Sequence, residues 1–440
     1  MALHFRYAKS GIARRMRHVW LSRTLWNRRF IFLIGAVLVA AVAVGFAVAA
    51  NIANAWLHQM LNAWRYASLV LAPTGFAAVS YLGRRFFSGA QGSGIPQTIS
   101  ALAHRSPAFR DRLLSLRVAA GKIALTLIGL LCGASIGREG PTVQIGAAIM
   151  YSMSRVASFP HEAMNRGLIL AGGAAGVAAA FNAPLAGVVF AIEEMSRSFS
   201  QRTSGIVLTA VIVAGIVSLA ILGDYAYFGH TRAVLDVSSA WLAVLVCGAG
   251  GGLVGGSFSR LLIEASARLP GRLAAIRSAW PDLFAALCGL AVAIIGLLSD
   301  NTIYGTGYGE TRAIIEGGYT PQSFGALKLV ATVVSYVSGI PGGIFSPSLA
   351  IGAGFGQNVA LLLPGAPVAA VAILGMVGYF SGVVQAPLTA FVIVIEMTRD
   401  SDMALPLLAV SLIASGFSRF VCPRPVYKAL AKAFTPGQIV

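Results

Sequence analysis

The sequence predicts an all-α protein that crosses a lipid bilayer many times, and three observations predict it. Hydrophobic residues make up 57% of the chain and charged residues 11%, whereas a soluble globular protein carries about 25% charged residues. Residues 31–50 contain no charge, and a helix needs roughly 20 apolar residues to cross the hydrocarbon core. The chain also has 50 glycines, which suit closely packed and interrupted membrane helices. This composition excludes a soluble enzyme, a disordered chain and a simple nucleic-acid-binding protein.

A series of apolar segments predicts the helices. Several are too short to cross a membrane or are cut by Gly or Pro, and such helices are expected to stop inside the membrane, where their ends can serve a polar site. In chain order the segments are 31–56, 67–82, 118–136, 142–158, 167–192, 205–222, 240–263, 283–299, 326–340, 347–363, 367–395 and 404–421.

The net charge of +18 is unevenly placed. Residues 1–30 carry basic side chains and no acid, which predicts a cytoplasmic arm beside anionic lipid rather than a nucleic-acid-binding segment. The more acidic connections 223–238 and 299–319 are expected on the external side of the membrane. The histidines form no metal-binding pattern, and Cys132, Cys247, Cys288 and Cys422 are interpreted as packing residues.

The chain repeats itself. Gly137–Pro141 matches Gly343–Pro347 at an offset of 206, and Pro184 with Glu193 matches Pro387 with Glu396 at an offset of 203. The repeat predicts two membrane halves, and the number of spans leaves open whether they are parallel or inverted. The expected organisation is a basic cytoplasmic arm at 1–30, a first repeat at 31–223, an external linker at 224–237, a second repeat at 238–421 and a cytoplasmic tail at 422–440.

Three glycine-containing turns lead into predicted helices, at 92–96, 137–141 and 343–347. Proline suits the first helical position, and each helix N-terminus presents backbone N–H groups with about half a positive charge. If these termini converge, they form an anion site. The alternative is that each turn simply begins a membrane helix.

Four acidic residues accompany the turns and apolar helices. Glu139 lies in the second turn, whereas Glu193, Glu194 and Glu396 end or follow apolar helices. Ionisable groups within membrane segments usually mark ion or proton paths. Helix-end capping or an interfacial salt bridge is the alternative for the last three.

These motifs resemble those of the CLC family of chloride channels and proton-coupled chloride exchangers. The resemblance lies in G-S-G-I-P at 92–96, G-R-E-G-P at 137–141, G-I-F-S-P at 343–347, F-N-A-P-L-A-G at 181–187, E-E-M at 193–195 and a tyrosine at 427. It implies a fold of two inverted repeats with many tilted and broken helices, and a homodimer with a separate anion pore in each subunit.

The resemblance also implies roles for individual residues. Glu139 resembles the external gating glutamate, which competes with the anion and carries the proton, and Glu194 resembles the internal proton glutamate. Two roles stay open for a further set of residues: they shape or charge the pore, or they are structural. These residues are Lys122, Arg138, Phe181 and Asn182. The candidate anion-binding residues are Ser93, Gly94, Ile95, Gly140, Ile344, Phe345 and Tyr427.

The sequence therefore predicts a proton-coupled chloride exchanger in a bacterial inner membrane, with both termini in the cytoplasm and no cofactor, metal or nucleic acid. A passive chloride channel of the same fold, gated by voltage or pH, is the alternative, against which Glu194 argues. Ser93 and Tyr427 keep the chloride-type pattern and so disfavour a fluoride exporter. An intramembrane hydrolase would use the serine of G-A-S-I-G at 133–137, but the sequence offers no histidine partner.

Overall fold

A computed structural model describes residues 23–156, 162–196, 201–223, 227–229, 237–400 and 402–435. Most of the predicted basic arm and most of the predicted external linker lie outside these residues. The described part of the chain is helical and contains no strand beyond two isolated β-bridges. The predicted all-α fold class is confirmed.

The first half of the chain begins with a long helix and contains several shorter ones. Its helices are α2 (Arg23–Ala63), α3 (Ser68–Phe86), α4 (Ile95–Ala103), α5 (Pro107–Leu114), α6 (Leu116–Leu131), α7 (Glu139–Val156), α8 (Glu162–Phe181), α9 (Pro184–Phe190), the π-helix η1 (Ala191–Ser196) and α10 (Gln201–Leu222).

The second half also begins with a long helix and contains several shorter ones. Its helices are α11 (Val237–Ala267), α12 (Gly271–Ala279), α13 (Pro281–Leu298), α14 (Tyr308–Ile315), α15 (Phe324–Val337), α16 (Phe345–Ala360), α17 (Val368–Val384), α18 (Pro387–Thr398), α19 (Ala404–Val421), α20 (Val426–Ala431) and the 3₁₀ turn η2 (Lys432–Phe434).

Within the described ranges, seven helical segments are long and apolar enough to cross a membrane. They are Trp26–Ala63, Pro107–Leu131, Met164–Phe181, Gly205–Leu222, Trp241–Ala267, Pro281–Leu298 and Ala404–Val421. Shorter apolar helices such as Val368–Val384 and Pro387–Thr398 lie between them in the chain, as expected for a protein with helices that end inside the bilayer.

The two halves use the same packing. In the first half the backbone of Gly146 on α7 lies directly against that of Gly172 on α8, and in the second half Gly352 on α16 lies against Gly375 on α17 in the same way. A side chain at any of these positions would overlap the neighbouring backbone, so glycine permits the close approach.

The predicted segments 167–192 and 367–395 each contain a break at an equivalent place. Asn182 and Gln385 have positive φ angles of 53° and 56°, and a proline two residues later begins the next helix. Proline cannot supply the N–H that a continuous helix would need, so each segment divides into two helices.

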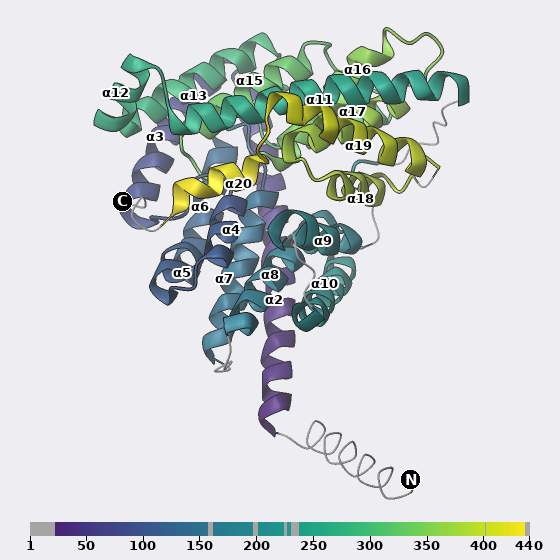
Figure 1. Cartoon of the computed structure of the whole chain (residues 1–440). Coiled ribbons are helices and arrows are strands. Elements are labelled where there is room, and N and C mark those ends of the chain that lie inside the picture. The colour runs from purple at the N-terminus through teal and green to yellow at the C-terminus, as the bar shows by residue number, and fades with distance from the viewer. Residues whose placement is uncertain are drawn as a thin grey trace, which may run out of the picture.

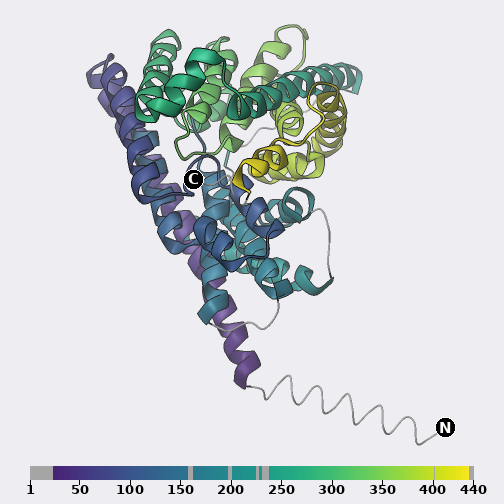
Figure 2. The same cartoon turned by 60° about the vertical axis from the view of Figure 1, so that its left-hand side comes forward.

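Figures 1 and 2 show how the halves are arranged. Helices α4–α10 gather in one half of the molecule and α11–α19 in the other, while α3 packs against α13 and so joins them. The C-terminal helix α20 returns to the boundary between the halves and packs against α4. The beginning of α4 thus lies close to elements from both repeats and to the C-terminal segment.

Candidate anion and proton site

The conformation of the turn before α4 depends on its glycines and on hydrogen bonds from two buried side chains. Gly92 and Gly94 have φ angles of 65° and 104°, which favour glycine. The Gln97 amide oxygen accepts a hydrogen bond from the Gly94 N–H at 2.9 Å. The ammonium of Lys122 donates to the carbonyls of Ala90 (2.7 Å), Gln91 (3.2 Å) and Gly92 (2.7 Å).

Lys122 therefore has a structural position. Its side chain is buried, and its ammonium group can donate three hydrogen bonds, all of which go to backbone carbonyls of the loop before Ser93. Lys122 therefore stabilises this loop. Lys328 does the same in the second repeat, where it donates to the carbonyls of Ile303, Tyr304 and Gly305 before α14.

The three glycine turns meet at the centre of the molecule. Gly137 donates to the Gly343 carbonyl at 2.6 Å, and Gly343 donates to the Gly137 carbonyl at 2.7 Å. The N–H of Gly342 donates to the Gly92 carbonyl at 3.1 Å. These bonds bring together the N-terminal ends of α4, α7 and α16, where positive ends of helix dipoles and free N–H groups accumulate.

Gly140 allows this approach. A Cβ atom at residue 140 would overlap the Ser93 hydroxyl and would lie 2.7 Å from the Ser93 carbonyl oxygen and 3.3 Å from the Gly343 Cα. The first turn of α7 therefore rests on both other turns. The Ser93 hydroxyl is buried and has no hydrogen-bond partner among the described residues, so it is available as a donor to an anion.

The Glu139 carboxylate lies where the helix ends meet. Glu139 is 1% exposed, and neither carboxylate oxygen accepts a hydrogen bond within the described part of the chain. Its Oε2 lies 2.6 Å from the position of a Cβ on Gly137, and the Pro347 Cδ lies 3.0 Å from that same position. The Glu139 side chain thus sits between the starts of α7 and α16.

Arg138 supplies a fixed positive charge beside this carboxylate. Its Nε lies 3.7 Å from Glu139 Oε1. The guanidinium donates to Asn51 Oδ1 and to the Tyr227 hydroxyl, both at 2.9 Å, and to the carbonyl of Ala47. These contacts tie the charge at residue 138 to α2 and to the described segment 227–229.

The aromatic candidates flank the start of α16. The Phe345 ring lies 4.3 Å from the Phe380 ring and 5.1 Å from the Phe181 ring, measured between centroids. Tyr427 on α20 is fully buried, and its hydroxyl has no hydrogen-bond partner among the described residues. Tyr427 interacts electrostatically with the buried carboxyl groups of Glu139 and Glu194.

Glu193, Glu194 and Glu396 separate into two kinds. Glu194 lies on η1, is 2% exposed and belongs to the interior region of Tyr427. Glu193 and Glu396 instead accept backbone hydrogen bonds at the starts of α18 and α9. For these two, the helix-capping alternative describes what the structure shows.

Two further glycine-rich segments, at 133–137 and 250–255, are explained by packing and hydrogen bonding. Ser135 of the G-A-S-I-G motif is buried, and its hydroxyl forms a hydrogen bond with the Thr332 hydroxyl at 3.0 Å. The glycines of residues 250–255 lie within α11, where Gly251 and Gly255 touch the backbone of α17 and Gly252 touches that of α19.

Sequence reasoning missed two tyrosines of this region. The Tyr336 hydroxyl lies 3.9 Å from the Cβ position of Gly92, within electrostatic range of Tyr427. Tyr227 contacts Arg138. Neither belongs to a motif, and an aromatic residue in an apolar segment gives no signal of its own.

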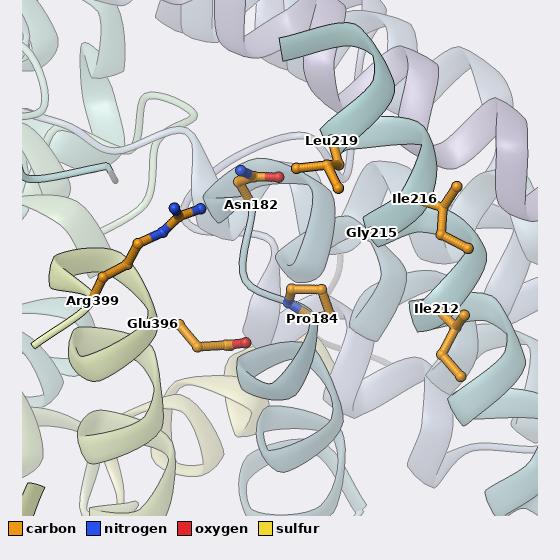
Figure 3. A pocket seen from close by; sticks show the side chains of 8 residues that line it. All are labelled: Asn182, Pro184, Ile212, Gly215, Ile216, Leu219, Glu396 and Arg399. Carbon is orange, nitrogen blue, oxygen red and sulfur yellow. The ribbon is translucent and has the colours of Figure 1, made fainter. Parts of the chain in front are cut away.

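A cavity of about 520 Å³ lies away from the meeting helix ends, between α9, α10 and α18 (Figure 3). Its α10 wall is apolar, and the Glu396 side chain reaches from α18 toward Pro184 at the start of α9. None of the predicted anion-binding residues lines this cavity.

The fold and site together define an all-helical membrane protein whose centre is built from helix N-termini contributed by two repeats. A family model described as "Voltage gated chloride channel" matches residues 74–419. The chain belongs to this family, the CLC family.

The protein is similar to curated bacterial proteins. It is 30% identical over 421 residues to the H(+)/Cl(-) exchange transporter ClcA of Vibrio vulnificus (strain YJ016), covering 91% of this chain and 88% of that one. It is 32% identical over 455 residues to the H(+)/Cl(-) exchange transporter ClcA of Yersinia pestis bv. Antiqua (strain Angola), covering 93% and 90%.

Solved structures share the fold. A slow cyanobacterial Cl-/H+ antiporter is 28% identical with a TM-score of 0.76, covering 92% of this chain and 96% of that one. A CLC-type fluoride/proton antiporter is 24% identical with a TM-score of 0.78, covering 92% and 98%, and this likeness concerns the fold.

Proposed function

We propose that this protein exchanges chloride for protons across a bacterial inner membrane. The observation that carries the proposal is the position of the Glu139 carboxylate among the converging ends of α4, α7 and α16. A carboxylate in that position occupies a place that suits a chloride ion, because the helix ends stabilise either negative charge. The names of the bacterial relatives support chloride and protons as the transported ions.

The mechanism follows from competition between the two anions. While Glu139 is ionised, its carboxylate holds the helix ends and excludes chloride from them. When it takes up a proton it loses the charge that the helix ends favour, so chloride replaces it. Deprotonation returns the carboxylate and expels the chloride, which couples movement of the two ions.

The remaining residues divide the work. Ser93 and Tyr427 offer buried hydroxyl donors to chloride that has lost its water, and the N–H groups at Ile344 and Phe345 offer backbone donors. Glu194 passes protons between the cytoplasm and Glu139. Arg138 adds positive charge beside the gate without entering the chloride path.

The active form we propose is a homodimer, each subunit having its own pathway, with both termini in the cytoplasm. A protease-cleavable tag placed before residue 1 should resist protease added outside intact cells. Cleavage of that tag in intact cells would reverse the proposed orientation.

The experiment that tests the function uses purified full-length protein in liposomes. An outward chloride gradient should drive protons into the liposomes against their own gradient, because chloride that leaves is exchanged for protons that enter. Chloride efflux without proton uptake would indicate a passive channel, and absence of chloride efflux would refute anion transport.

A further inference from the structure

Glu396 ties the end of one repeat to a helix of the other. It lies near the end of α18, and its carboxylate accepts hydrogen bonds from the N–H groups of Leu185 (3.1 Å) and Ala186 (2.6 Å) in the first turn of α9. Figure 3 shows the side chain reaching across from α18 toward Pro184. A carboxylate at this place satisfies N–H groups that the helix itself leaves unpaired.

Glu193 makes the reciprocal contact. It follows α9 on η1, and its carboxylate accepts hydrogen bonds from the N–H groups of Leu388 (3.3 Å) and Thr389 (2.6 Å) in the first turn of α18. Glu193 and Glu396 occupy equivalent positions nine residues after Pro184 and Pro387. The two helical segments are therefore joined at both ends by one carboxylate from each repeat.

This pair of contacts fixes the rotation of one helical segment about its axis. α9 continues without a break into η1, so residues 184–196 form one segment packed against α18. One contact would allow the segment to pivot, but contacts at both ends hold its direction and its rotation together. Charged hydrogen bonds of this kind are about twice as strong as neutral ones.

Glu194 lies on the π-helical turn η1, next to Glu193, so its position depends on the orientation of the segment 184–196. Glu193 and Glu194 are consecutive, yet Glu193 reaches α18 while Glu194 is buried in the region of Tyr427. Single π-helical turns are rare and often occur at functional sites. Rotation of the segment would move Glu194 out of this region.

We propose that Glu396 is a positioning residue for Glu194, and that Glu193 and Glu396 form a two-ended clamp that holds the segment 184–196 in register. The proposal rests on the proposed function in that Glu194 carries protons. Glu396 acts on proton movement through the backbone of α9 and η1, although it comes from the other repeat and is 202 residues away from Glu194 in the sequence.

The first test measures protons moved per chloride in liposomes for Glu396→Gln and Glu396→Ala. Gln keeps one acceptor oxygen and loses the charge, whereas Ala removes both acceptors. Proton coupling should fall in the order Glu, Gln, Ala, with chloride flux within about twofold of wild type, because the chloride path does not include residue 396. Glu264→Ala, which removes an exposed glutamate paired with Arg260, is the control and should couple normally.

Equal coupling in all three forms would overturn the positioning role. A parallel loss of chloride and proton flux would also overturn it, because that outcome describes general misfolding. If the wild-type protein moves chloride without protons, the proposed exchange is wrong. The contacts of Glu193 and Glu396 are then tested by the second experiment alone.

The second test does not depend on transport. In a protein with Cys132, Cys288 and Cys422 changed to Ala, Glu194→Cys reports how exposed residue 194 is to a water-soluble thiol reagent. Cys247 is retained because it is fully buried and would react only on global unfolding. Adding Glu396→Ala should speed labelling at residue 194 by about tenfold, the effect of losing a helix cap, and leave Cys247 unlabelled.

An unchanged labelling rate at residue 194 would overturn the clamp. Labelling of Cys247 together with residue 194 would overturn it as well, because the whole protein would then have opened.

Discussion

Gly137 and Gly343 exchange two backbone hydrogen bonds, of 2.6 and 2.7 Å, although 206 residues separate them in the sequence. They are equivalent residues of the two repeats, so an approximate two-fold axis passes between them. The bridge is antiparallel, and α7 and α16 therefore leave the centre in different directions with their N-terminal ends together. The geometry supports inverted repeats and explains how both repeats contribute to one site.

The first prediction concerns the contact at Gly140. Gly140→Ala places a methyl group against Ser93 and near Gly343 and pushes the first turn of α7 away from the other turns. Overpacking of this kind costs about 1–3 kcal/mol. We expect a lower melting temperature and chloride binding weakened by about tenfold, measured by calorimetric titration.

Gly45→Ala is the matched control, because a Cβ on Gly45 in α2 would meet no atom within 4 Å beyond its own helix among the described residues. It should bind chloride as wild type does. Equal affinities in Gly140→Ala and Gly45→Ala would show that the close approach at residue 140 does not shape the anion site.

The second prediction concerns the Ser93 hydroxyl. Ser93→Ala removes a buried donor that makes no hydrogen bond within the described residues. A lost hydrogen bond to a charged group costs about 1.5–3 kcal/mol, so chloride affinity should fall by at least about tenfold while the melting temperature stays close to that of wild type.

Ser348→Ala is the control for Ser93, because the Ser348 hydroxyl already donates, at 2.6 Å, to the carbonyl of Ile344, the residue just before α16. It should leave chloride binding unchanged. A similar affinity for Ser93→Ala and wild type would mean that the hydroxyl does not meet the anion.

The third prediction separates two buried lysines. Lys122→Met and Lys328→Met each leave three carbonyls without their donor, so both should lower the free energy of unfolding by about 1–3 kcal/mol. Lys122 holds the loop that carries Ser93, whereas Lys328 holds the loop before α14. Only Lys122→Met should change the preference between chloride and nitrate in competition binding. An altered preference in Lys328→Met alone would contradict this assignment.

The fourth prediction concerns Glu194. Glu194→Gln keeps the size of the side chain and removes its titration. Proton movement should fall to background in liposomes, while chloride flux should continue and still rise at low pH, because Glu139 continues to titrate. Proton coupling at the wild-type level would remove Glu194 from the proton path and leave the role of Glu139 standing.

The sequence predicted the three turns because local rules govern them. Gly92 and Gly94 have positive φ and Pro96 lies at the start of α4, as the motif at 92–96 predicts. Pro141 and Pro347, in contrast, are the third residues of α7 and α16 and not the first. The sequence also predicted the repeat, since equivalent residues stand at nearly constant offsets. The binding roles of these residues stay predictions that the experiments above test.

Other features could not be predicted because they depend on contacts between distant segments. The sequence leaves open whether Lys122 faces the pore or the protein, and its hydrogen bonds to three carbonyls depend on how α6 is placed beside the turn before α4. The same holds for Glu193 and Glu396, whose partners lie 195–196 and 210–211 residues away. Tyr227 and Tyr336 reach the site through packing and belong to no motif.

The central claim is that one carboxylate, Glu139, is both the gate for chloride and the carrier of the proton. The most direct test is paired chloride and proton flux in liposomes containing Glu139→Gln under a chloride gradient. The amide cannot titrate, so chloride should flow with little dependence on pH and without any proton uptake. Proton uptake at the wild-type ratio in Glu139→Gln would contradict the account.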